Sequence, residues 1–214
     1  MDLLIAVYIF CIVTAETMGG KTFPLANIFG FQLNSSVAIF LIPVIFSVND
    51  VITEVYGKER TRSIIRSGLI TVFLIFLASI IFTILPPSSR FASTESSYDA
   101  IFGLSARIAA ASLTAFALAE FLDVYIFTKV REKLGKKSLW LRVNISNFAA
   151  QFVDTVVFMT LAFYAFNQPF GQNAAFLVSL ILPYWFLKCF MSVIETPFVY
   201  LGVHWLKSGK KEAK

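Results

Sequence analysis

Long apolar runs separated by short charged segments dominate the chain. A membrane-spanning helix needs about 20 mainly apolar residues, and six stretches meet or approach that length. They are Leu3–Met18, Ser36–Val48, Ile64–Leu85, Ala106–Thr128, Leu139–Phe166 and Ala174–Leu206. The pattern predicts an all-α integral membrane protein with six transmembrane helices, folded as a single domain over residues 1–214.

The second run is short, contains Pro43 and follows a semi-apolar stretch, Phe23–Leu33. We expect this stretch to enter the membrane without spanning it. Irregular backbone at membrane depth is tolerated only where protein or a cavity covers it. The region before Asp50 is therefore a candidate cavity wall, and an ordinary proline kink is the alternative interpretation.

Composition and charge support a membrane protein and argue against nucleic-acid binding. Hydrophobic residues make up 57% of the chain and charged residues only 14%, against about 25% in soluble domains. The net charge is +5, but the basic residues lie in short loops rather than on one solvated face. Cys11 and Cys189 fall inside apolar runs, where we interpret them as small buried hydrophobes.

The distribution of lysine and arginine predicts the orientation. Loops on one side carry fourteen basic residues and those on the other side at most three. Because cytoplasmic loops are enriched in lysine and arginine, both termini are predicted to be cytoplasmic. The basic side comprises Lys58, Arg60, Arg62, Arg66, Lys129, Arg131, Lys133, Lys136, Lys137, Arg142, Lys207, Lys210, Lys211 and Lys214; the other holds Lys21, Arg90 and Arg107.

Several ionisable residues lie within or at the edges of the predicted spans. A charge at the bilayer centre costs at least about 2.5–3.5 kcal/mol, so such residues normally face a protein interior or a wet cavity. A functional role is the default hypothesis; ion pairs that only fix helix packing are the alternative, favoured most for Glu16. The set comprises Glu16, Asp50, Glu54, Glu120, Asp123, Asp154, Lys188 and Glu195.

Polar residues form one stripe on each of the last two predicted helices, at steps of three, four and three. Such spacing places each set on one helical face. A short connection at 167–173 predicts antiparallel neighbours, with Asp154 and Lys188 at similar depth and able to pair. Amide and carboxylate groups lining a shared cavity would suit a small planar heterocycle. The stripes are Asn144, Asn147, Gln151 and Asp154, and Trp185, Lys188, Ser192 and Glu195.

The sequence offers little support for catalysis or for a cofactor. Gly20-Lys21-Thr22 resembles the end of a phosphate-binding loop, but Ala15 stands where its first glycine should be and Pro24 follows. His204 is the only histidine and sits near the predicted interface. We therefore predict no enzyme activity, no metal and no cofactor.

Four blocks in order resemble the queuosine precursor transporter family, of the vitamin-uptake type. The resemblance runs from about residue 43 to residue 201 and is strongest at Asn49-Asp50-Val51-Ile52-Thr53-Glu54-Val55-Tyr56-Gly57-Lys58. The other blocks are Glu120 and Asp123 with Arg131; Trp140, Arg142, Ser146, Gln151, Asp154-Thr155 and Phe158; and Lys188, Glu195-Thr196-Pro197 and Tyr200.

The resemblance implies six spans, a fold similar to the substrate-binding components of vitamin importers, and import of 7-deazaguanine precursors of the tRNA base queuosine. It leaves open whether the substrate is the cyano form, the aminomethyl form or queuine. It also implies location in the inner membrane. A homodimer is left open, as is the energy source.

We therefore expect a deazapurine transporter in which Asp154, Gln151 and Asn147 hold the base edge, Lys188 and Glu195 face them, and Trp185 or Tyr184 stacks on the ring. One alternative is the substrate-binding subunit of an ATP-driven vitamin importer with another heterocyclic substrate. Another is a structural membrane protein whose polar stripes only hold helices together. The candidate substrate-binding residues are Asp50, Asp123, Asn147, Gln151, Asp154, Trp185, Lys188 and Glu195.

Overall fold

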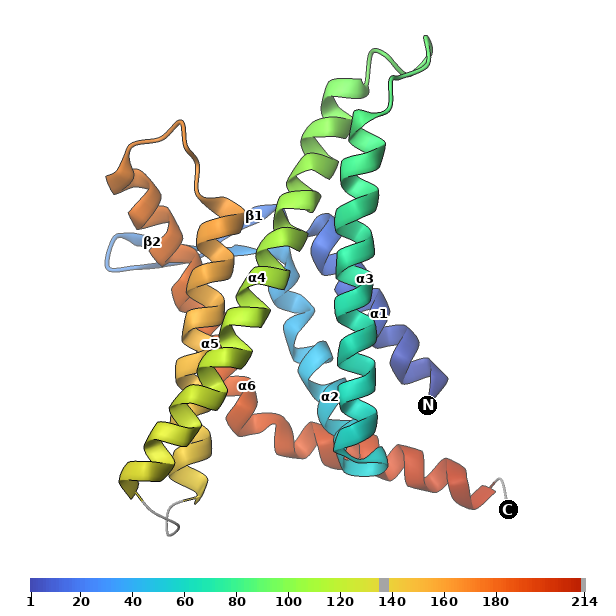
Figure 1. Cartoon of the computed structure of the whole chain (residues 1–214), viewed down its shortest axis with the longest axis vertical. Helices are drawn as coiled ribbons and strands as arrows, with labels where there is room; N and C mark the ends of the chain where they lie inside the picture. Colours follow the sequence, from blue (N-terminus) through green and yellow to red (C-terminus); the bar gives the residue numbers. More distant parts are fainter. Residues whose placement is uncertain (135–138, 213–214) are drawn as a thin grey trace.

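The computed structural model describes the backbone of residues 1–134 and 139–212, and their side chains except at 58, 123–124, 127–147 and 192–212. Within this part, each predicted span contains a helix (Figure 1). The helices are α1 (Asp2–Met18), α2 (Ile42–Tyr56), α3 (Lys58–Ile84), α4 (Glu95–Leu134), α5 (Leu139–Phe163) and α6 (Phe170–Glu212), and a short 3-10 helix, η1 (Val37–Phe40), precedes α2.

Four described segments are long and apolar enough to cross a membrane: Val37–Tyr56, Glu59–Ile84, Glu95–Leu122 and Phe170–Met191. Phe148–Phe163, within α5, is a shorter apolar helix. Helix α1 has 17 residues, or about 26 Å at ~1.5 Å per residue. Large apolar side chains point outward, as Ile70 and Phe121 do at 60% and 74% exposure. A lipid-facing surface accounts for this exposure, which water would disfavour.

The segment between α1 and η1 forms a β-hairpin, an addition to the expected all-α architecture. Strands β1 (Thr22–Ile28) and β2 (Phe31–Ser36) pair antiparallel, with an irregularity between Pro24 and Ala26. Phe29 and Gly30 both have positive φ, 52° and 84°, as a two-residue hairpin turn requires. The stretch predicted to enter the membrane irregularly is therefore an ordered ribbon. Asn34 of β2 fixes it to α6 by donating a 2.9 Å hydrogen bond to Ser179 Oγ.

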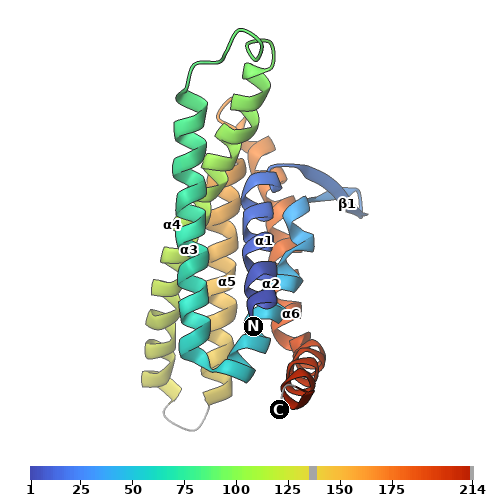
Figure 2. The same cartoon turned by 90° about the vertical axis from the view of Figure 1, so that its right-hand side faces the viewer.

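The helices form two layers, best seen in Figure 2. Helices α3, α4 and α5 make one layer, while α1, α2 and the first part of α6 lie beside them in the other. Between the layers are two apolar clusters of buried side chains. One contains Tyr8, Ile52 and Ile64, and the other includes Met159 and Leu180, both fully buried. The C-terminal part of α6 turns and runs beneath α2 and α3 in Figure 1.

Polar side chains secure the ends of α5 and α6. Arg107 of α4 donates from Nε to Leu161 O and from Nη2 to Tyr164 O, both at 2.6 Å. These carbonyls lie at the C-terminal end of α5, where intrahelical partners run out and a cation is favourable. Asn173, in the first turn of α6, accepts from Ala165 N at 2.9 Å and donates to Ala165 O at 2.8 Å. The connection from α5 to α6 is thus held on both sides.

Candidate functional site

A cavity of about 270 Å³ lies inside the bundle, and residues from all six helices line it. Its size is near the lower end of the ~300–1,000 Å³ typical of small-molecule sites. Most of the wall is apolar, with aliphatic residues such as Ile12, Ile45 and Val72. Into this apolar wall the chain places eight polar side chains: Tyr8, Glu16, Ser36, Ser112, Asp154, Thr155, Tyr184 and Lys188.

An ion pair between α5 and α6 forms one side of the cavity. Lys188 Nζ lies 2.6 Å from Asp154 Oδ2, so the pair expected between α5 and α6 forms. Their side chains are 15% and 27% exposed, respectively. Each charge would be costly alone at membrane depth, and pairing offsets that cost. The residual exposure leaves both groups open to a ligand in the cavity.

Tyr184 and Ser36 connect the cavity wall to the hairpin. Tyr184 is 4% exposed, and its hydroxyl donates a 3.3 Å hydrogen bond to Ser36 O. Ser36 Oγ donates to Gly19 O at 2.5 Å and accepts from Ala38 N at 3.1 Å. The serine therefore caps η1 and also ties it to the end of α1. The hydrogen bond at its hydroxyl and its attachment to the backbone of α6 together fix the Tyr184 ring on the cavity wall.

Glu16 enters the cavity from the last turn of α1. The residue is 7% exposed and is hydrogen-bonded to Ser112 of α4. Its second oxygen, Oε2, is buried and has no hydrogen-bond partner among the described residues. The sequence left a packing role open for Glu16 beside a functional one. The structure places the residue on the wall of the same cavity as the ion pair.

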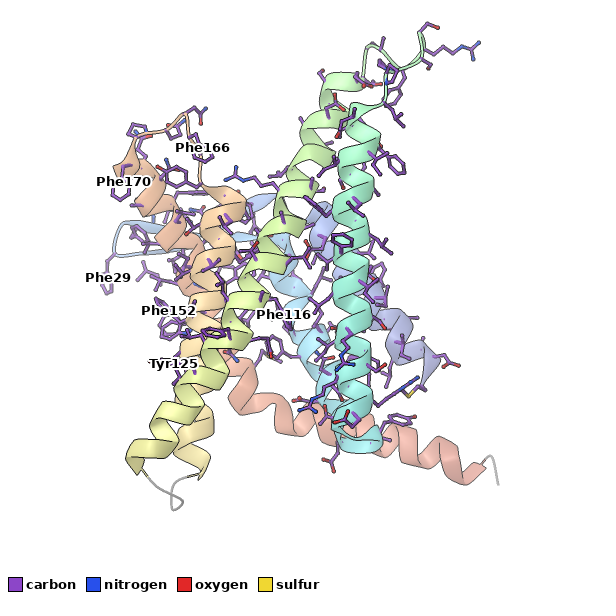
Figure 3. The ribbon with its side chains drawn as sticks, viewed as in Figure 1. Phe29, Phe116, Tyr125, Phe152, Phe166 and Phe170 are labelled. Atoms are coloured by element: carbon purple, nitrogen blue, oxygen red, sulfur yellow. The ribbon has the colours of Figure 1, made fainter. Side chains whose placement is uncertain are left out.

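Aromatic rings complete the wall. Phe116 of α4 lies among the helices in Figure 3, whereas Phe152 and Tyr125 lie on the outer side. Phe116 and Phe158 both line the cavity, and the Phe158 ring packs edge-to-face on Phe163 at 6.4 Å between centroids. Flat apolar surfaces next to an ion pair suit a planar ligand with a polar edge.

The structure brings only part of the predicted set to this cavity. Asp154 and Lys188 line it, whereas Asp50, Gln151 and Trp185 are not among its lining residues. Trp185 packs on Phe152, with 5.2 Å between ring centroids, and donates from Nε1 to Phe148 O at 3.4 Å. Tyr184, the other aromatic considered for stacking, is the one on the wall. The side chains of Asp123, Asn147 and Glu195 lie outside the described residues, so their roles stay predictions.

A second, larger hollow of about 1,190 Å³ lies between the hairpin and α6. Among the described residues its lining is apolar, with Leu25, Phe40, Phe148, Phe186 and Phe190 prominent, and it contains no charged side chain. Such a surface offers nothing to orient a polar solute. The chemistry for a polar ligand is in the internal cavity.

Membrane-crossing helices around a mostly apolar cavity with a buried ion pair define a multi-pass membrane protein. Comparison with known proteins identifies its family. The model of the family described as "Putative vitamin uptake transporter" matches residues 36–202. The chain belongs to this family. No solved structure matches it.

Three curated relatives agree with this assignment. A "Probable queuosine precursor transporter" of Bacillus subtilis is 28% identical over 172 residues, covering 79% of this chain and 72% of that protein. A protein of the same name from Haemophilus influenzae is 31% identical over 141 residues, covering 65% and 57%. The "Queuosine precursor transporter" of Escherichia coli is 27% identical over 172 residues, covering 78% and 71%.

Proposed function

We propose that this chain imports 7-deazaguanine precursors of queuosine across the cytoplasmic membrane and binds the base in the internal cavity. The observation that carries the proposal is the Asp154–Lys188 pair on the wall of a cavity that all six helices enclose. The names of the relatives supply the substrate class.

The pair matches the polar edge of a guanine-like base. That edge presents a carbonyl oxygen beside ring N–H and exocyclic amino donors. A carboxylate accepts two N–H bonds and an ammonium group donates to a carbonyl. Asp154 would therefore accept from the two nitrogen donors while Lys188 donates to the oxygen. The charges are already desolvated by the helices, so the hydrogen bonds that they make are stronger than in water.

The ring faces would lie against aromatic side chains. Tyr184 is held by its hydrogen bond to Ser36, and Phe116 and Phe158 are further rings on the wall. Offset or edge contacts between aromatic rings contribute about 0.5–1.5 kcal/mol beyond area burial. We assign the stacking role to Tyr184 rather than to Trp185, whose ring packs on Phe152.

We also propose that both termini face the cytoplasm. In Figures 1 and 2 both termini lie toward the same end of the bundle, where α2 joins α3. Figure 1 also shows α4 ending and α5 beginning at that end. The described parts of the three basic segments belong to this end, which supports a cytoplasmic assignment.

Uptake by the purified chain in liposomes tests the function. We expect entry of a labelled aminomethyl or cyano deazaguanine, competed by the unlabelled base and not by adenine. The alternative is a substrate-binding subunit, with a fold similar to such components of vitamin importers, which needs a separate ATP-driven motor. Transport by this chain alone would exclude that alternative. Binding without transport would favour that alternative. Absence of both binding and transport for every deazaguanine would refute the proposal.

A further inference from the structure

Glu16 stands apart from the ion pair although it shares the cavity. It is 7% exposed and interacts with Ser112, and its Oε2 has no hydrogen-bond partner among the described residues. The family match begins at residue 36, so this position lies outside the matched part. Nothing in the base-recognition scheme requires a second carboxyl.

Among the described residues of the cavity wall, no unpaired basic group is present to neutralise a charged Glu16. Of the described groups on the wall, only Lys188 is basic, and it already lies 2.6 Å from Asp154. The other titratable groups are the hydroxyls of Tyr8 and Tyr184; α2 and α3 contribute only aliphatic side chains and Gly68. A carboxylate here would give the cavity a net negative charge.

The position of Glu16 in α1 makes a negative charge on its side chain still less favourable. Glu16 belongs to the last turn of α1, which ends at Met18, and the C-terminal end of a helix carries partial negative charge. A buried, unpaired carboxylate at membrane depth is costly and usually functional. The cavity therefore accommodates the neutral acid, whereas contact with bulk water on either side of the membrane removes the cost of the charged form.

We propose that Glu16 is the proton-binding residue that couples transport to the proton gradient. It takes one proton from the outer solution, crosses the closed state as a neutral acid, and releases the proton to the cytoplasm with each substrate. This inference rests on the proposed function. For the neutral cyano form, at one proton per substrate, each unit of pH difference supports about tenfold accumulation.

The test compares Glu16→Gln with wild type in liposomes. Glutamine has nearly the shape of the neutral acid and keeps hydrogen-bonding capacity toward Ser112, but it carries no proton. We expect substrate counterflow without a gradient to stay within about threefold of wild type. Accumulation driven by an acidic exterior should fall to the equilibrium level. Glu59→Gln is the matched control, because Glu59 has an 86% exposed side chain on α3, paired with Arg62, and should accumulate like wild type.

Two outcomes would overturn the inference while leaving the proposed function intact. One is gradient-driven accumulation of substrate by Glu16→Gln. The other is a wild-type protein that shows counterflow but whose accumulation of substrate does not depend on the pH gradient. Absence of wild-type counterflow would refute the proposed function and the inference with it. A second measurement does not depend on the folding of the variant. A pH dye inside wild-type liposomes should report acidification as substrate enters, and substrate entry without acidification would also overturn the proposal.

Discussion

Replacing Asp154 with asparagine removes one charge from the cavity while keeping the shape of the side chain. In a fully buried pair, loss of one partner costs about 3–5 kcal/mol, since the other charge is left uncompensated. Here the side chains of Asp154 and Lys188 are 27% and 15% exposed, and an amide oxygen can still accept from Nζ. We therefore expect a loss of about 2–3 kcal/mol in the free energy of unfolding, with correct insertion and a monodisperse protein.

Substrate affinity should fall as well, through a separate loss of hydrogen bonding to the base. The amide cannot accept two N–H bonds with full charge, and hydrogen bonds to charged groups contribute about 1.5–3 kcal/mol. This corresponds to roughly a 10- to 150-fold increase in Kd, which titration calorimetry on protein in nanodiscs would measure. Thermal unfolding without ligand supplies the stability term separately.

Two further variants separate recognition from packing. Asp154→Leu combined with Lys188→Met removes both charges, so stability should return to within about 1–2 kcal/mol of wild type, while substrate binding should be lost. Glu59→Gln removes one partner of an exposed pair 2.8 Å apart, with side chains 86% and 65% exposed, and should change stability by at most about 0.5 kcal/mol. Wild-type Kd in Asp154→Asn, or transport by the doubly apolar variant, would refute a substrate role for the pair.

Three more predictions address the frame around the cavity. Arg107→Gln should lower stability by about 1.5–3 kcal/mol, because two 2.6 Å bonds to carbonyl oxygens are weakened or lost, with Kd unchanged; a large change in Kd would contradict this in the same titration. Gly68→Ala should cost about 1–2 kcal/mol in thermal unfolding, because the new Cβ would lie 2.7 Å from Ile12 Cδ1 and 3.1 Å from the ring of Tyr8; an unchanged melting temperature would show that the helices part freely. Reporter fusions at Ser93 should read outside and at Lys137 inside, and the opposite readings would reverse the proposed topology.

Helix existence and the pairing of α5 with α6 were predictable from the sequence because each leaves a periodic signal. Asp154 recurs with Gln151 on one face, and Lys188 falls at matching depth on a helix of opposite direction. The 2.6 Å contact follows from that geometry. The polar stripe did not show which aromatic ring lines the cavity. Tyr184 lies four residues before Lys188, which turns its side chain about 40° away from that of Lys188 around the helix axis. Trp185 lies three residues before Lys188, which turns its side chain about 60° away.

Glu16 and the hairpin were harder to predict for different reasons. A single acid on an apolar helix has no periodic partner, so its direction depends on how α1 packs against α4, which the sequence alone does not state. The hairpin mixes Pro24, Asn27 and Gln32 with apolar residues over a short stretch. Gly30 after Phe29 was the available signal for a tight turn.

The two layers of helices are joined covalently at just two described places. The chain crosses from one layer to the other at Gly57, after α2, and crosses back at the connection from α5 to α6. Asn173 clamps the second crossing to the backbone of Ala165, whereas Gly57 has φ 83° and ψ 163°, a conformation open to glycine and strained for other residues. A side chain at Gly57 would therefore strain the first crossing, where the hydroxyls of Thr53 and Thr61, 2.8 Å apart, also tie α2 to α3.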